Sequence, residues 1–520
     1  MSRWREGFKQ VRNYPSAILG LALIAFLFGL AAYTVVFLSF EEAELHWRGQ
    51  EAVRQNPINA WPAWINAFGY DLPETMVLTS EEDATVERDG SELRIEFEFD
   101  YTYSDFPSEM ALFLEAEFDE RLPYARMRWH TPAGEVFPLG SRSVGAYERV
   151  SITQDSHLER FFYGKYPHVG LLSDPRHQNQ AEILSDDVIP ALGEIVAWVA
   201  DDEQQVVTER LGEQFVLTEE EAQWVFEEVR ALLAQGVDEQ ERLAAALQRR
   251  ADELRATAEV LPGTYRIEIL VDLMHTEEDA ADVRATFVSY GLVHGVAGTD
   301  HMRRDLSVAL MWGTPVALAF GLLAAVGTTI TTLIIAAIGV WFGGIIDATI
   351  QRITEVNIIL PLLPILVMIG TLYSTSIWLM LGVVILLGIF SASIKMYRAM
   401  LLPIRESPYI EAARAYGAGN FRIVFRYMIP RVLPVLIPSF VTLIPTYVFL
   451  EASLAVLGLG DPTLPTWGKL LHDAQEHGAL EFGHYYWVLA PTVMLMLTGL
   501  GFAMFGFALD RIFNPRLRRI

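Results

Sequence analysis

The densest group of potential metal ligands in this sequence is His472, Asp473, Glu476 and His477. His472 and Glu476 are four residues apart, so on a helix they lie one turn apart and both can reach one ion. A solvated loop is the competing interpretation, because a short His/Asp/Glu run is a weak pattern. We assign no metal site to these residues, and the sequence leaves open whether they bind one.

One carboxylate, Glu451, lies within an apolar stretch that is long enough to cross a membrane. A charged group in a span is costly unless it faces water or a partner, so Glu451 is a candidate for a transport path or gate. Gly458 and Gly460, which follow it, belong to the same candidate site. The alternative is a structural role, with the side chain held by a hydrogen bond between helices.

Sequence patterns for ATP hydrolysis and for hydrolytic catalysis do not occur in this sequence. The two Gly-Lys pairs, Gly164-Lys165 and Gly468-Lys469, lack the Ser or Thr that completes a phosphate-binding loop. Neither G-x-S-x-G nor H-E-x-x-H is present. Cysteine is absent, which excludes disulfides and thiol catalysis. We therefore predict that the chain is not an enzyme and has no ATPase site of its own.

Residues 405–430, RESPYIEAARAYGAGNFRIVFRYMIP, form a basic segment between two apolar stretches. Ser407 is expected to cap a helix that Pro408 opens, since proline at the first helical position gives up no needed donor. Gly417 and Gly419 are expected to form the left-handed turn that ends this helix. The segment therefore predicts a helix–turn–helix.

The second helix of this segment is expected to begin after a cap at Asn420 and to end at Pro430. Small side chains in the first helix would let the surface of another protein approach closely. They are Ala412, Ala413, Ala415 and Gly417. An ordinary cytoplasmic loop with positive charge is the alternative interpretation.

The charge of the chain divides it into a membrane part and an insert. The 520 residues carry a net charge of −26, and 52% of them are hydrophobic. Residues 1–40 and 306–520 hold 17 Lys/Arg and 11 Asp/Glu, a balance of +6. Residues 41–305 hold the other 22 and 54, a balance of −32. This pattern indicates a mildly basic membrane part that carries a strongly acidic insert.

Six apolar stretches are predicted to cross the membrane, and the first of them, about 25 residues long, is enough to cross a hydrocarbon core of ~30 Å. They lie near residues 16–40, 315–342, 358–373, 377–392, 435–457 and 486–507. The first is expected to be an uncleaved anchor, because it is too long for a typical signal peptide. Basic clusters at the N-terminus, at 395–431 and at 511–519 then share one side, which the Lys/Arg bias identifies as cytoplasmic.

The insert has the composition of a folded α+β domain. Residues 93–99 alternate strictly between apolar and charged side chains, and Pro132-Ala133-Gly134 predicts a turn between two strands. Residues 189–258 instead repeat with helical periodicity, and Thr218 with Glu221 has the spacing of a capping box. The acidic charge is expected either to keep this domain soluble or to help a partner dock.

Several motifs resemble those of the binding-protein-dependent ABC transporter permeases. Six residues of the 405–430 segment match the EAA loop, which in that family docks on a cytoplasmic ATPase subunit. They are Glu411, Ala412, Ala413, Gly417, Ile429 and Pro430. Three further stretches resemble the dipeptide, oligopeptide and nickel branch of the family.

The first of these stretches resembles a GTD…GRD element. It comprises Gly298, Thr299, Asp300, Arg304 and Asp305. Arg303 stands where the family usually has glycine, which puts the turn there in question. The other two are residues 451–460, which resemble the end of the fifth span, and residues 465–468, which resemble the loop that follows it. The resemblance covers residues 1–40 and about 296–520, and the insert lies outside it.

The resemblance implies a membrane all-α bundle of six transmembrane helices. With the insert, the expected fold has three parts: residues 1–40 with the first span, an extracytoplasmic α+β insert at 41–305, and a five-helix permease core at 306–520. The implied protein is a multi-pass permease subunit in a prokaryotic plasma membrane, with both termini cytoplasmic. A di- or oligopeptide is the expected cargo, and a nickel chelate or another small solute is the alternative.

The resemblance also implies partners. These are a second permease subunit, cytoplasmic ATPase subunits that carry ATP and Mg, and an extracytoplasmic solute-binding protein. No cofactor is expected in this chain and no nucleic acid is expected as a partner. A membrane-anchored binding or sensor protein, with the insert as its functional part, is the alternative from another class.

Overall fold

The computed structural model describes residues 15–48, 54–118, 121–154, 166–201, 203–235, 240–256, 258–273 and 282–513. The basic clusters before residue 15 and at 516–519, and the Gly164-Lys165 pair, lie outside these residues. The chain divides into two compact units, which we call the helical unit (Met1–Ala63 with His294–Ile520) and the insert unit (Trp64–Val293).

The insert unit is shorter at both ends than the 41–305 domain expected from the sequence. The segment before it is hydrogen-bonded to the chain that leaves it. The Ala63 amide donates to the Gly295 carbonyl at 2.9 Å, and the His294 amide donates to the Trp61 carbonyl at 2.7 Å. Residues 54–63 and 294–305 therefore belong with the helices.

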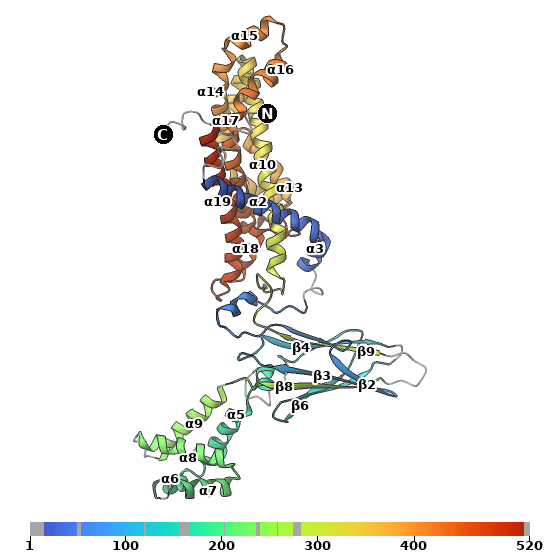
Figure 1. Ribbon diagram of the computed structural model, residues 1–520, viewed down its shortest axis with the longest axis vertical. Coiled ribbons are helices and arrows are strands. Elements are labelled where there is room, and N and C mark those ends of the chain that lie inside the picture. The colour runs from blue at the N-terminus through green and yellow to red at the C-terminus, as the bar shows by residue number, and fades with distance from the viewer. Residues whose placement is uncertain are drawn as a thin grey trace. The chain divides into compact units, whose positions relative to one another are not determined.

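Within the described part of the helical unit, four helices are long and apolar enough to cross a membrane (Figure 1). They are α2 (Pro15–Phe37), α10 (Leu306–Phe342), α17 (Ile429–Leu454), which continues a helix from Asn420, and α19 (Tyr485–Phe513). Two bent pairs raise the number to as many as six if each pair counts as one span. They are α11 (Gly344–Ile359) with α12 (Leu362–Leu372), bent by 79°, and α13 (Ile377–Ile389) with α14 (Ser393–Arg405), bent by 46°.

The apolar stretch at 358–373 is therefore not one straight helix. Helix α11 ends at Ile359, and α12 begins after Pro361. Proline has no amide hydrogen and disfavours helical backbone at the residue before it, so the helix breaks there. Pro364 stands within the first turn of α12, where the missing donor is not needed.

Glycines let the long helices approach one another closely. A Cβ atom on Gly321 of α10 would lie 2.6 Å from the Val448 side chain and 2.9 Å from the Ile444 carbonyl of α17. A Cβ atom on Gly20 of α2 would lie 2.9 Å from the Gly501 carbonyl of α19. Because lipid tails are as apolar as the side chains, such close packing is what holds membrane helices together.

The described residues of the insert unit form two antiparallel sheets. One has the order β1-β9-β4-β7 and the other β2-β3-β8-β5-β6. The strands are β1 (Met76–Thr79), β2 (Ala84–Asp89), β3 (Glu92–Tyr101), β4 (Glu109–Glu117), β5 (Tyr124–His130), β6 (Val136–Ser143), β7 (Glu148–Ser151), β8 (Gly263–Asp272) and β9 (Asp282–Tyr290).

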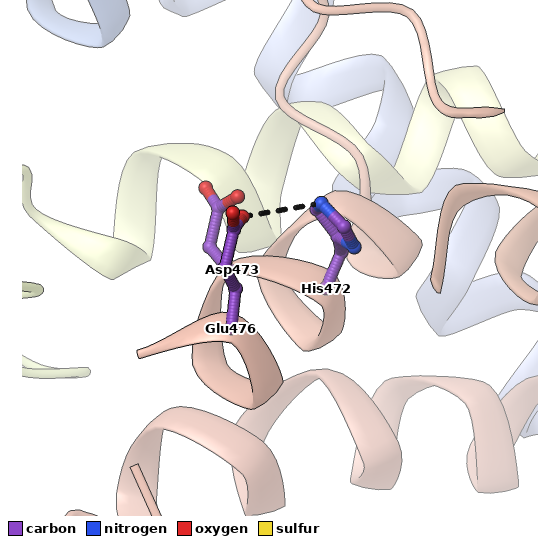
Figure 2. Close-up of side chains that lie close together, drawn as sticks. All are labelled: His472, Asp473 and Glu476. Carbon is purple, nitrogen blue, oxygen red and sulfur yellow. Dashed lines mark ion pairs between the residues drawn. The ribbon is translucent and has the colours of Figure 1, made fainter. Parts of the chain in front are cut away.

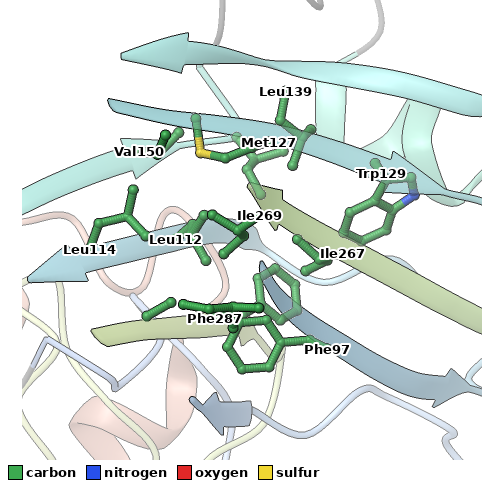
Figure 3. Close-up of a cluster of buried hydrophobic side chains, with 14 of the residues drawn as sticks. Phe97, Leu112, Leu114, Met127, Trp129, Leu139, Val150, Ile267, Ile269 and Phe287 are labelled. Atoms are coloured by element: carbon green, nitrogen blue, oxygen red, sulfur yellow. The ribbon is translucent and has the colours of Figure 1, made fainter. Parts of the chain in front are cut away.

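One hydrophobic core is shared by the two sheets (Figure 3). The alternation predicted for residues 93–99 is confirmed, because the apolar residues of β3 in this range are buried while the charged residues between them are not. Phe287 of β9 and Trp129 of β5, from opposite sheets, meet at a ring distance of 6.0 Å. The predicted turn at 132–134 joins β5 to β6, with Gly134 at φ 89°.

Helices between β7 and β8 enclose a second, separate core. They are α5 (Pro175–Glu182), the π-helical η3 (Ile183–Val188), α6 (Leu192–Asp201), α7 (Gln204–Phe215), α8 (Glu219–Ala234) and α9 (Gln240–Ala256). Helix α4 (Pro167–Leu172), which precedes them, instead packs Leu171 and Leu172 into the core of the sheets. The predicted capping box starts α8: the Thr218 amide donates to the Glu221 carboxylate at 2.8 Å, and the Glu221 amide donates to the Thr218 hydroxyl at 3.3 Å. The α+β character predicted for the insert is present in this unit.

Replacing Val216 with glycine is expected to stabilise these helices. Val216 follows α7 with φ 56° and ψ 40°, a left-handed conformation that is unfavourable for a β-branched residue, and its side chain is 90% exposed. Glycine removes this strain and costs some unfolded-state entropy, for a net gain on the order of 0.5–1 kcal/mol. Hydrogen exchange of α7 in the full-length protein should slow several-fold. Val216→Asn should give part of the gain, and faster exchange in both variants would contradict the explanation.

Candidate functional site

The 405–430 segment folds as two short helices joined by a glycine turn. Helix α15 (Pro408–Ala415) follows α14, and α16 (Asn420–Ile423) continues through the π-helical η4 (Val424–Met428) into α17. Gly417 has φ 79°, the left-handed conformation that was predicted. A Cβ atom added there would meet nothing within 4 Å, so backbone conformation alone favours glycine at this position.

Three details of the predicted segment are wrong. The Ser407 hydroxyl donates to the Ile404 carbonyl instead of capping α15. Gly419 is the residue that precedes α16, and Asn420 is its first helical residue. Pro430 does not end the second helix, because it stands in the first turn of α17, immediately after the π-helical turn. The continuous helix carries the segment directly into a candidate span.

The six residues that resemble the EAA loop do not all lie on its surface. Glu411, Ala412, Gly417 and Pro430 are exposed and Ala413 is half-buried. Ile429 is 9% exposed and belongs to the core beneath the loop. The surface also presents large apolar side chains that the motif does not include, with Tyr416 92% exposed and Phe421 65% exposed.

The loop is attached to the C-terminal end of α10. Ile410 is buried in the same core as Val340 of α10. The Arg414 guanidinium lies 5.4 Å from the Trp341 ring centre, and Arg405 Nη1 donates to the Val340 carbonyl at 3.0 Å. These contacts join α15 and the end of α14 to α10.

A bidentate ion pair that sequence reasoning missed lies near this end of α10. Arg398 of α14 donates to Asp347 of α11, with Nε–Oδ1 at 3.0 Å and Nη2–Oδ2 at 2.8 Å. The two residues are 51 positions apart and neither belongs to a motif. Each bent helix pair thus contributes one charge to the contact between them.

The GTD…RD element forms a closed loop at the N-terminal end of α10. The Asp300 carboxylate accepts the amides of Met302 and Arg304 at 2.8 and 2.9 Å, and the Leu306 amide returns to the Gly298 carbonyl at 3.0 Å. Asp305 caps α10 through the Ser307 amide at 2.7 Å. The structure therefore brings the predicted residues of this element together.

Arg303 adopts φ 65°, a left-handed conformation that glycine adopts without strain. The turn questioned at the sequence level therefore forms, with arginine carrying the strain of a left-handed backbone. Two hydrogen bonds with Asn56 hold Arg303 in this conformation. Arg303 Nη1 donates to the Asn56 carbonyl at 2.6 Å, and Asn56 Nδ2 donates to the Arg303 carbonyl at 3.0 Å.

Gly298 and Thr299 hold the segment that precedes the insert unit. Gly298 has φ 79°, and a Cβ atom there would lie 2.4 Å from the Ala60 carbonyl. The buried Thr299 hydroxyl donates to the Pro57 carbonyl at 2.8 Å and accepts the Ala60 amide at 2.9 Å. The Tyr486 hydroxyl of α19 donates to the Thr299 carbonyl at 2.9 Å. At position 298, only glycine leaves room for the Ala60 carbonyl.

A buried ion network joins this loop to α18 (Trp467–Glu476). Arg304, 6% exposed, donates from Nε to Asp300 Oδ2 at 2.5 Å and from Nη2 to Asp473 Oδ2 at 2.8 Å. Lys469 Nζ lies 2.7 Å from Asp473 Oδ1. The guanidinium also lies 3.9 Å from the ring centre of Trp47, in α3 (Phe40–Arg48). Two carboxylates and two cations balance one another here.

The candidate metal ligands lie on α18, beside this network (Figure 2). Ligand atoms of His472, Asp473 and Glu476 lie within 4.8 Å of one another, and His472 Nε2 is 3.4 Å from Glu476 Oε2. Both Asp473 oxygens already accept from Arg304 and Lys469, so a metal ion at this carboxylate would face two cations. The geometry makes Asp473 part of the ion network.

His477, the fourth residue of that sequence cluster, does not join the other three. Its ring stacks on His301 at a centre distance of 3.5 Å, and Trp487 of α19 lies 5.6 Å from His301. Burial lowers the pKa of His301, and the nearby Asp300 carboxylate opposes that shift. This stack connects the Asp300 loop, α18 and α19.

Glu451 lies in α17 and is 6% exposed. Its carboxylate oxygen Oε2 is buried and has no hydrogen-bond partner among the described residues. Gly458, at φ 83°, lies in the π-helical η5 (Ala455–Leu459) at the end of α17, and Gly460 follows it. The buried carboxyl therefore lies beside the segment that leads into α18.

Residues 465–468 pack inside the bundle and do not form a surface loop. Trp467 is fully buried, and its Nε1 donates to the Leu310 carbonyl of α10 at 2.9 Å. Gly313 of α10 makes room for the indole, since a Cβ atom there would lie 2.5 Å from it. A Cβ atom on Gly468 would lie 2.7 Å from Ala452 Cα. Trp467 and Gly468 thus pack the start of α18 against α10 and α17.

Comparisons with known proteins place these features in a family context. Residues 329–519 match the family model of the binding-protein-dependent transport system inner membrane component. A dipeptide transport system permease protein of Bacillus subtilis (strain 168) is 26% identical over 223 residues, which cover 43% of this chain and 69% of the relative.

Two proteins of Brucella suis biovar 1 (strain 1330) are also similar. A putative peptide permease protein is 30% identical over 220 residues, covering 42% of this chain and 72% of the relative. A putative peptide transport system permease protein is 30% identical over 246 residues, covering 46% of this chain and 79% of the relative.

Proposed function

Because the chain belongs to the binding-protein-dependent ABC transporter permeases, we propose that it forms half of the path of an ATP-driven importer for di- or oligopeptides. It is a multi-pass protein of the plasma membrane. Its partners would be a second permease subunit, cytoplasmic ATPase subunits that hold ATP and Mg, and an extracytoplasmic solute-binding protein. The names of the peptide permease relatives support the cargo class, with a nickel chelate as the alternative.

The observation that carries the coupling proposal is the 405–430 loop and its attachment to α10. Its exposed face combines Glu411 and small residues with the protruding Tyr416 and Phe421. An ATPase groove that takes up these rings would hold the loop, and α15 would then move with the ATPase. Ile410, Arg414 and Arg405 transmit that motion to the end of α10.

Helix α10 connects the 405–430 loop to the buried ion network. It runs from Leu306 to Phe342 and is about 55 Å long at 1.5 Å per residue. Its first end carries the Asp300–Arg304–Asp473 network, and its last end carries the loop contacts. ATP-driven closure of the ATPase subunits would therefore shift α10 and, with it, Trp467 and α18. This is a switch between two packings of the bundle.

The proposed topology has six spans, with each bent pair counted as one, and both termini in the cytoplasm. Seven Lys/Arg between residues 395 and 431 oppose only Glu406 and Glu411, and this bias supports a cytoplasmic loop. Residues 41–305 would then be extracytoplasmic, where the acidic insert can meet the solute-binding protein.

Affinity purification of the full-length chain in mild detergent tests the proposal. We expect a second permease and at least one P-loop ATPase to co-purify, and a Tyr416→Ser, Phe421→Ser double variant to retain the permease while losing most of the ATPase. Leu480→Ser, at a 57% exposed position outside the loop, is the control. Recovery of the chain without any ATPase, under conditions that preserve the membrane assembly, would favour the sensor interpretation.

A further inference from the structure

An uncharged aromatic segment stands out in the otherwise acidic stretch that follows the first span. Residues 56–70, NPINAWPAWINAFGY, contain no charged side chain, whereas residues 41–305 carry a balance of −32. Four aromatic rings fall within it: Trp61, Trp64, Phe68 and Tyr70. The permease family resemblance does not extend to this segment.

The first half of the segment is fixed at the end of a candidate span. The Trp61 ring lies 5.3 Å from the ring of Tyr486, the second residue of α19. The carbonyl of Trp61 and the amide of Ala63 are hydrogen-bonded to His294 and Gly295. Helix α19 qualifies as a span over 27 residues, about 40 Å at 1.5 Å per residue. That length exceeds a hydrocarbon core of ~30 Å, so its ends reach the headgroup layers.

The second half is a preformed loop that presents its aromatic side chains outward. The 3-10 helix η1 (Ala63–Phe68) contains no buried residue. Asn66 closes the loop by donating to the Leu72 carbonyl at 2.9 Å and accepting the Leu72 amide at 3.2 Å. Gly69 turns the tip with φ 93°. At this tip Phe68 is 75% exposed and Tyr70 is 59% exposed, and Trp64 is 55% exposed.

We propose that residues 63–70 are an interfacial anchor, which we call the aromatic anchor, and that it inserts its rings into the headgroup layer of the bilayer. Trp and Tyr favour this layer because their rings are apolar while their N–H and O–H groups stay hydrated. Trp64 is three residues, at most ~10 Å of chain, beyond Trp61, which is within reach of a headgroup layer ~5–8 Å thick. The absence of charge also avoids repulsion by anionic lipids.

The anchor fixes where the insert leaves the membrane. Its reach is limited by the length of chain that follows Trp61, and this limit does not depend on the transported solute or on which side the insert occupies. A failure of the importer proposal would therefore leave the aromatic anchor standing. A failure of the aromatic anchor would likewise leave the importer proposal standing.

Site-directed spin labelling tests the aromatic anchor, and the absence of cysteine makes each label unique. Phe68→Cys and Tyr70→Cys would be labelled with a nitroxide in the full-length chain, in vesicles of phosphatidylethanolamine and phosphatidylglycerol. Val216→Cys, 90% exposed in the insert unit, serves as the aqueous control. Phe26→Cys, 54% exposed near the middle of α2, serves as the bilayer control.

Collisions of the labels with oxygen and with a water-soluble nickel chelate report depth. We expect the ratio of oxygen to nickel accessibility at positions 68 and 70 to exceed that at 216 several-fold and to stay below that at 26. Nickel accessibility equal to that at 216 overturns the proposal, because the rings would then face water. Shielding from both reagents also overturns it, because the rings would then be covered by protein.

Discussion

Replacing Gly417 with valine is expected to abolish peptide uptake while the protein still inserts in the membrane. Gly417 has φ 79°, which a β-branched residue adopts at a cost on the order of 1–3 kcal/mol. A Cβ atom meets nothing within 4 Å, so the damage is confined to the turn between α15 and α16. The turn would rearrange and displace Glu411 and Tyr416 from the surface that we assign to the ATPase.

The measurement is peptide-stimulated ATPase activity and uptake by the assembled complex in proteoliposomes. Gly417→Asn is the matched control, because asparagine tolerates the left-handed conformation far better than valine, and it should retain much of the activity. Normal transport-coupled ATPase activity in the valine variant would show that the turn plays no part in docking.

Replacing Arg304 with methionine is expected to destabilise the helical unit strongly. The guanidinium is 6% exposed and pairs with two carboxylates, Asp300 and Asp473, that are 0% and 5% exposed. Its removal leaves Asp300 without a cation and Asp473 with Lys469 alone. Breaking a buried pair in this way typically costs about 3–5 kcal/mol. Thermal unfolding of the purified protein in detergent should shift downward by many degrees.

Two further variants separate charge from packing at this site. Arg304→Lys keeps the charge but loses the two-pronged geometry, so it should recover only part of the stability. Asp300→Asn combined with Arg304→Met removes one uncompensated charge and should be less damaging than Arg304→Met alone. An unchanged melting temperature for Arg304→Met would mean that the network does not hold α18 in place.

Local features of this protein were predictable because neighbouring residues determine them. The hydropathy of α2, α10 and α19 indicated spans, since length and apolarity alone decide whether a helix can cross a bilayer. The alternation in β3 and the capping box at Thr218 followed from side-chain period and from a three-residue spacing. Gly417 marked a left-handed turn for the same reason.

Local rules also gave a wrong end for the second helix of the 405–430 segment. Pro430 looks like a helix end because it lacks an amide hydrogen. In the structure the π-helical turn before it ends one hydrogen-bonding pattern, and the proline occupies the first turn of the next helix. Strand β9 was not predicted, although it lies between β1 and β4 and pairs with both.

The tertiary structure alone decided which charges meet. Arg304 and Asp473 are 169 residues apart, and Trp47 reaches the same guanidinium from a third part of the chain. In the sequence Asp473 had the appearance of a metal ligand, because only its near neighbours were visible. Pairing of buried charges depends on which helices pack together. Contacts throughout the bundle, such as Trp467 against Gly313, determine that packing. The spacing of residues in the sequence determines the local geometry of this protein, whereas long-range packing determines which charged residues pair.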